Sequence, residues 1–123
     1  MVDVRIDEEK QILVWSHSGM VTELDLISAI DKTKDFADNY PNLKLLELNN
    51  DSPLDFGVTK TLEIAIYAKK YFPLFNSVKH AFVSNTPINI ASFIMLISSR
   101  FNVKHKIKAF STKEAAIEWL FEK

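Results

Sequence analysis

The sequence predicts an α/β domain with a five-stranded, mixed but mostly parallel sheet and four helices. Short apolar segments alternate along the chain with segments of helical period, a pattern typical of parallel strands joined by crossover helices. Residues 7–10 form a polar turn between the first two apolar segments, which suits an antiparallel hairpin. The length of 123 residues fits one domain over 1–123. The predicted order is β-β-α-β-α-β-α-β-α.

Three of the predicted strands lie in the N-terminal half. Residues 2–6 alternate between apolar and charged side chains, which is the period of a half-buried strand. Residues 12–15 are all apolar and predict a second, more buried strand antiparallel to the first. Residues 43–48 predict a third, largely buried strand.

The first helix is expected between the second and third strands. Thr22 can cap its first turn with the hydroxyl oxygen, while the Asp25 carboxylate can accept from the backbone N–H of Thr22 in return. An apolar stripe continues to Tyr40, and Pro41 stands just past the expected end.

The C-terminal half continues the alternation. A helix is expected over 58–72, ending near Pro73, and strands are expected over 78–83 and 107–110. Residues 111–114 (Ser-Thr-Lys-Glu) match a capping box and predict the start of the last helix.

The predicted helix over 88–97 is apolar on nearly every side. Thr86 and Pro87 precede it as a cap and a first helical residue. Only Asn89 and Ser92 are polar within it, and it is too short to span a bilayer, which takes about 20 residues. A buried core helix, a homodimer interface and a lipid-contacting face all remain open for it.

Composition excludes several classes of function. The chain has no cysteine, so disulfides, thiolate metal sites and a cysteine nucleophile are excluded. A net charge of −1 argues against nucleic-acid binding as the main activity. No glycine-rich phosphate loop, signal peptide or transmembrane segment is visible, so we expect a cytoplasmic protein without a cofactor.

The charges are divided unevenly along the chain. Residues 1–55 hold twelve acids and five bases, whereas residues 56–123 hold four acids and ten bases. Two solvated faces that fold back beside each other would explain this division. A polarised surface that orients a partner would explain it as well.

Three segments carry a resemblance to a known family. They are Gly19 followed by MVTELDL (20–26), LLEL (45–48) and AFSTKEAAIEWL (109–120). In this order and spacing the chain resembles the SpoIIAA-like proteins, small and mostly uncharacterised bacterial domains grouped with the STAS and SEC14-type folds. The resemblance implies the same fold, and it implies a regulatory or ligand-binding role.

One departure from that family concerns its phosphorylation switch. In the anti-sigma-factor antagonists the loop after the third strand reads Asp-Ser-x-Gly and includes a switch serine. Here Asp51 and Ser52 are followed by Pro53 and Leu54, and the proline lacks an N–H that could bind a phosphate. The sequence therefore argues against transfer of the switch to Ser52.

The polar loop after the third strand is the best candidate for a functional surface. Ligands of open α/β sheets bind beyond the carboxyl ends of the strands, where this loop is expected. Turn formation and helix capping would explain the same residue types, and an Asp51/Asp55 pair could also bind a cation or act as acid and base. The predicted partner or ligand surface comprises Asn49, Asn50, Asp51, Ser52, Asp55 and Thr86.

A group of aromatic residues is the candidate for an apolar pocket. Such a pocket would lie between the second helix and the apolar helix over 88–97, as the SEC14-type resemblance implies. Core packing is the stronger explanation of the same residues, although the sequence cannot separate the two. The residues are Phe56, Tyr67, Tyr71 and Phe93.

No catalytic or metal-binding residue is predicted. The histidines His17, His80 and His105 have no second metal ligand at helical or strand spacing, so we expect structural roles, with His80 about half exposed. Ser16 and Ser18 flank His17 but lack the Gly-x-Ser-x-Gly pattern of a nucleophile elbow.

The expected function is therefore a non-enzymatic, cytoplasmic binding or regulatory module that engages a protein partner, with a possible homodimer and no nucleic-acid target. The alternative is a carrier or sensor of a small apolar or lipid-like ligand.

Overall fold

The computed structural model describes residues 1–87, 89 and 105–122. Their elements, in chain order, are β1 (Val2–Asp7), β2 (Ile12–His17), α1 (Glu23–Lys34), β3 (Asn42–Leu48), α2 (Val58–Tyr71), the 3-10 helix η1 (Phe72–Leu74), β4 (Ser77–Val83), β5 (His105–Phe110) and α4 (Lys113–Leu120).

The five strands form one sheet in the order β1-β2-β3-β4-β5. β1 is antiparallel to β2, and each of the other neighbouring pairs is parallel. The α/β class and the five-stranded mixed sheet predicted from the sequence are confirmed. Because β2, β3 and β4 are parallel, their carboxyl ends lie at the same edge of the sheet.

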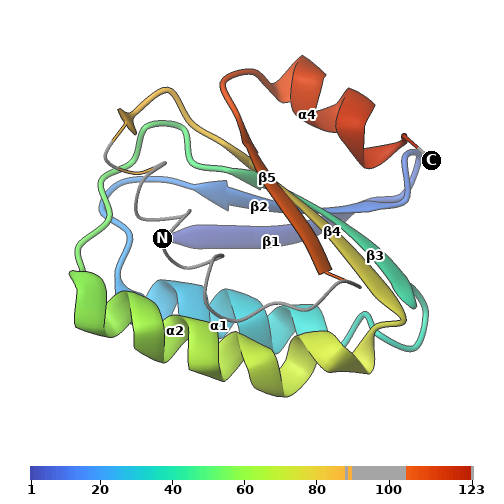
Figure 1. The fold of residues 1–123 in the computed structure, drawn as a ribbon, viewed down its shortest axis with the longest axis horizontal. Coiled ribbons are helices and arrows are strands. Elements are labelled where there is room, and N and C mark those ends of the chain that lie inside the picture. The colour runs from blue at the N-terminus through green and yellow to red at the C-terminus, as the bar shows by residue number, and fades with distance from the viewer. Residues whose placement is uncertain (88, 90–104, 123) are drawn as a thin grey trace.

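The helices cover the two faces of the sheet unequally. α1 and α2 pack side by side on one face, and α4 lies on the other (Figure 1). The described residues therefore contain three α-helices, where the sequence predicted four. The predicted helix over 88–97, with its core, dimer and lipid-contact alternatives, lies outside the described residues except for Asn89.

The start of α1 is as predicted, but its end is not. Thr22 Oγ1 accepts from Asp25 N at 3.2 Å, and Asp25 Oδ2 accepts from Thr22 N at 2.9 Å, which completes the capping box. The helix ends at Lys34 rather than Tyr40. The backbone N–H groups of Phe36 and Ala37 bond three residues back instead of four, and this tighter turn ends the α-helix.

The start of α4 also differs from the prediction. Its cap is Thr112, whose Oγ1 accepts from Ala115 N at 3.2 Å, rather than Ser111. Ala115 has no side-chain acceptor to complete a capping box, and Glu114 falls one position too early to do so. A single-sided cap is therefore what the local sequence can form.

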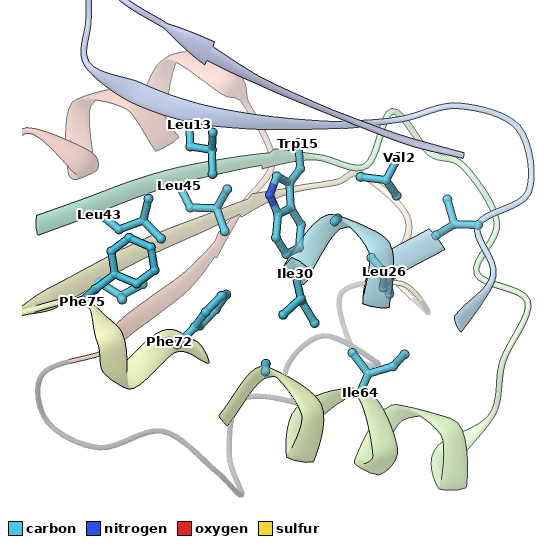
Figure 2. Close-up of a cluster of buried hydrophobic side chains, with 14 residues drawn as sticks. Val2, Leu13, Trp15, Leu26, Ile30, Leu43, Leu45, Ile64, Phe72 and Phe75 are labelled. Carbon is cyan, nitrogen blue, oxygen red and sulfur yellow. The ribbon is translucent and has the colours of Figure 1, made fainter. Parts of the chain in front are cut away.

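The larger core lies between the sheet and the helices α1 and α2. Alternate residues of each strand point to this face, as the period of two requires. Figure 2 shows Trp15 reaching from β2 toward α1, beside Ile30. The indole Nε1–H donates to Thr33 Oγ1 at 2.9 Å, and the Thr33 hydroxyl donates to Ala29 O at 2.7 Å. This buried polar chain fixes the position of β2 on α1.

A smaller core lies on the opposite face, beneath α4. The inward side of α4 presents Ala116 and Leu120, both fully buried. They pack against the other set of alternate strand residues, which comprises Ile12, Val14, Leu46 and Ala81. Within the described residues no helix is both long and apolar enough to cross a membrane.

Thr33→Val should lower the free energy of unfolding by about 1–3 kcal/mol, because the buried Trp15 N–H then lacks an acceptor. The matched control is Thr61→Val in α2. Thr61 is also buried, but its hydroxyl only donates to Gly57 O, so its removal leaves no donor without an acceptor. Urea unfolding of both variants checks the prediction, and equal losses of stability would contradict it.

Candidate functional site

A buried carboxylate marks the edge of the sheet where β2, β3 and β4 end. Glu47 of β3 is only 4% exposed, and it lies on the same face as Leu45, toward α1 and α2. Its Oε2 lies 2.7 Å from His17 Nε2, and its Oε1 lies 2.8 Å from His80 Nε2. The two histidines, from the neighbouring strands β2 and β4, are 2% and 5% exposed. The three side chains form a His-Glu-His bridge across the sheet.

The Glu47 carboxyl is ionised in this setting. Burial alone raises the pKa of a carboxyl group, because it removes water from the charged form. Hydrogen bonds from His17 and His80 outweigh burial here, and they lower the pKa of Glu47 from 4.5 to about 2. The site is thus built around a fixed buried negative charge.

Asn49, directly after β3, connects this bridge to the loop beyond it. Its Nδ2 donates to Ser52 O at 3.0 Å and to His17 Nδ1 at 3.1 Å. Its Oδ1 accepts from Ser84 Oγ and from Asn89 Nδ2, both at 2.9 Å. Because the Ser52 carbonyl can only accept, it determines the orientation of the Asn49 amide. His17 Nδ1 is then an acceptor, so the proton that His17 shares with Glu47 is on Nε2.

The loop above this network is exposed and held in an uncommon backbone conformation. Asn50 and Asp51 both have left-handed φ angles, of 52° and 55°. Asn50 Nδ2 donates to His17 O at 3.0 Å and to Ser16 Oγ at 3.2 Å. Asp51 Oδ1 accepts from Thr86 Oγ1 at 3.0 Å and from the backbone N–H of Asn85 at 3.1 Å. One loop residue is therefore anchored to the end of β2, and the next to the segment after β4.

The segments that follow β2, β3 and β4 lie together at one end of the sheet (Figure 1). The predicted surface residues divide into two groups there. Asn50, Asp51 and Asp55 are exposed and Thr86 is half-buried. Asn49 and Ser52 are 0% and 7% exposed, so they support the loop from below and are not available to a partner.

The described members of the predicted apolar pocket pack against the larger core. Phe56, Tyr67 and Tyr71 are half-buried there, with the two tyrosine rings 5.5 Å apart edge to face. Tyr67 donates to Asp31 Oδ1 on α1, and this hydrogen bond is the main reason that the pKa of Tyr67 is raised. These contacts join α2 to α1. Phe93 lies outside the described residues.

The residues at the centre of the site were not predicted as functional. His80 is buried, whereas the sequence suggested half exposure, and Glu47, His17, Ser84 and Asn89 were missed as a group. The burial of Glu47 could have been predicted, because strand alternation places it on the inward face with Leu45. A buried acid needs hydrogen-bond partners. The partners come from strands distant in the sequence, so their positions were not predictable from spacing.

The site is not arranged as a metal centre. In the ranges that the structure describes, no three histidine, aspartate or glutamate side chains form a group able to hold a metal ion. Both Glu47 oxygens point at histidine nitrogens instead. The arrangement holds an ionised carboxylate with one hydrogen bond to each oxygen, and through Asn49 it holds the exposed loop.

Comparison with known proteins identifies the fold. The chain is similar to the crystal structure of an uncharacterised protein from the DUF3478 family with a SpoIIAA-like fold, from Shewanella loihica PV-4. The TM-score is 0.59 at 15% identity, covering 98% of this chain and 92% of that one. No family model and no curated protein matches the sequence. The SpoIIAA-like fold expected from the sequence is confirmed.

Glu47→Gln should lower the free energy of unfolding near neutral pH by about 3 kcal/mol, because its amide removes the charge and places an N–H where one of the two histidines needs an acceptor. The folded pKa of Glu47, about 2, is lower than its ordinary value of 4.5. The stabilisation of the fold by the Glu47 charge is therefore complete above about pH 5 and is lost as the pH falls toward about 2.

Urea unfolding from about pH 7 to about pH 3 should thus show the gap between wild type and Glu47→Gln closing as the pH falls. The control is Glu118→Gln, which changes an exposed acid of α4 and should stay close to wild type at every pH. A gap of constant size would contradict the assigned charge of Glu47.

Proposed function

We propose that this chain is a non-enzymatic binding module that recognises a protein partner with the exposed loop residues Asn50, Asp51 and Asp55 and the neighbouring Asn85 and Thr86. The observation that carries the proposal is the clamped, left-handed pair of Asn50 and Asp51. Backbone conformations of this kind persist where the surrounding structure over-determines them, and they concentrate at functional sites.

A loop held in advance suits recognition for a thermodynamic reason. Ordering a flexible loop on binding costs free energy, and a preformed loop avoids much of that cost. The side chains of Asn50 and Asp51 bond to two different neighbouring segments, so the loop is fixed at both residues. Asp55 remains exposed beside them, and its carboxylate is available to a partner.

The burial of the titratable groups supports a binding role over catalysis. Glu47 has the carboxyl pKa that is lowered most clearly, yet it is 4% exposed and both of its oxygens are engaged. A general acid or base must be within reach of its substrate. Glu47 instead acts as a structural anion beneath the loop. Ser52, the position of the family's switch serine, is also buried.

The remaining expectations from the sequence form part of the same proposal. We place the module in the cytoplasm of a bacterium, with a STAS-type regulatory role and homodimerisation through residues 88–97. The alternative role, a carrier of a small apolar ligand beside Phe56, Tyr67, Tyr71 and Phe93, has less support. The described aromatic residues of that set already pack against the larger core, and Tyr67 also bonds to Asp31 of α1.

A photo-crosslinking amino acid in place of Asp55 should give a discrete adduct with one protein in cells that express this chain natively. The same amino acid in place of Lys69, an exposed residue of α2 away from the loop, should not. Adding Asp51→Ala to the Asp55 reporter should reduce the adduct about tenfold, because it releases the clamp to Asn85 and Thr86.

The matched control for the clamp is Asp38→Ala, which removes an exposed acid elsewhere on the surface and should leave the adduct intact. The proposal fails if no adduct forms at position 55, if positions 55 and 69 give the same adducts, or if both alanine variants act alike.

A further inference from the structure

A cavity lies on the face of the sheet opposite the candidate site. Its volume is about 290 Å³, and it is bounded by β1, the β1–β2 turn, β2, β3 and the start of α4. α4 packs chiefly over β3, β4 and β5, so the β1–β2 side of this face is not covered by a described helix. The volume is just below the range of ligand sites, which is roughly 300–1,000 Å³, so an occupant must be small.

The floor of the cavity is apolar. Strand alternation directs Ile12 and Val14 of β2, with Leu46 and Leu48 of β3, to this face, and Ile117 of α4 forms a side wall. An apolar group placed there would gain from leaving water. The floor therefore favours a ligand with a hydrocarbon body.

The rim of the cavity is mostly cationic. Arg5 of β1, Lys10 of the hairpin turn and Lys113 at the start of α4 line it, with Asp7 as its single acid. Asp7 Oδ1 accepts from the backbone N–H of Lys10 at 3.1 Å, so this carboxylate stabilises the β1–β2 turn. The ion pairs among the described residues involve none of the three cations. The rim therefore has positive charge that is complementary to an anion.

We infer that this cavity binds a small amphiphile with a carboxylate head and a short hydrocarbon tail. The tail lies on the apolar floor, and the carboxylate lies among Arg5, Lys10 and Lys113. A neutral apolar ligand would leave these cations partly desolvated without a partner, which is unfavourable. A bare inorganic anion would not use the floor. The inference does not depend on the proposed function, because the cavity and the loop of Asn50 and Asp51 share no residue.

Octanoate is a suitable probe. Calorimetric titration should show saturable binding at one site with a Kd of about 1 mM or tighter, the range open to a ligand of so few atoms. Octanol, with the same tail and no charge, should bind about tenfold more weakly or not at all. In NMR spectra, the octanoate-induced shifts should concentrate on Ile12, Val14, Leu46 and Ile117.

The double variant Arg5→Glu with Lys113→Glu should weaken octanoate binding about tenfold or more, because it reverses two charges of the rim. The matched control is Lys32→Glu with Lys69→Glu, which changes the net charge equally on the opposite face and should bind like wild type. All four positions are exposed, and circular dichroism should confirm that both variants fold.

Four outcomes would overturn the inference: no saturable octanoate binding, equal binding of octanol, equal weakening by both double variants, or shifts confined to α1 and α2. Sedimentation with phosphatidylglycerol vesicles in the absence of octanoate binding would also overturn it, since the cations would then bind a membrane surface. Loss of the Asp55 crosslink would leave it unaffected, so the two proposals fail separately.

Discussion

The ionised carboxylate of Glu47 is the constraint on which the rest of this structure depends. A charge with 4% exposure is stable in a protein interior only if its hydrogen bonds are satisfied, since desolvation of a single ion costs several kcal/mol. His17 and His80 provide those bonds from the two strands beside β3. The register of three strands is thereby coupled to one buried group, because a slip of one residue would turn a partner to the other face.

Glu47 also connects the interior to the surface, through His17 and Asn49. His17 bonds to Glu47 through one ring nitrogen and to Asn49 through the other. Asn49 uses its full hydrogen-bonding capacity, and its partners lie before, within and after the loop. A polar network that is fully satisfied is rigid, whereas one that lacks a member is costly. The exposed residues Asn50 and Asp51 are thus held by a hydrogen-bond network that has little freedom to move.

The two faces of the sheet offer different kinds of surface. On one face α1 and α2 cover the sheet, and Tyr67 joins the two helices through its hydrogen bond to Asp31. On the other face α4 leaves a cavity with an apolar floor and a cationic rim. The sequence pattern of the aromatic residues is compatible with core packing and with a pocket, because apolar periodicity is the same for both. In the structure, Phe56, Tyr67 and Tyr71 pack against the larger core.

The sequence by itself determined the five strands, the cap at Thr22 and the polar loop after β3. These features follow from side-chain alternation and from hydrogen bonds between residues a few positions apart. It did not show where α1 ends or which residue caps α4, since these depend on backbone bonds within a single turn. Only the tertiary structure decided that Glu47 meets His17 and His80, which lie 30 and 33 residues away. Contacts between residues so far apart depend on which strands pair and in which register, and the spacing of residues along the chain does not determine that pairing.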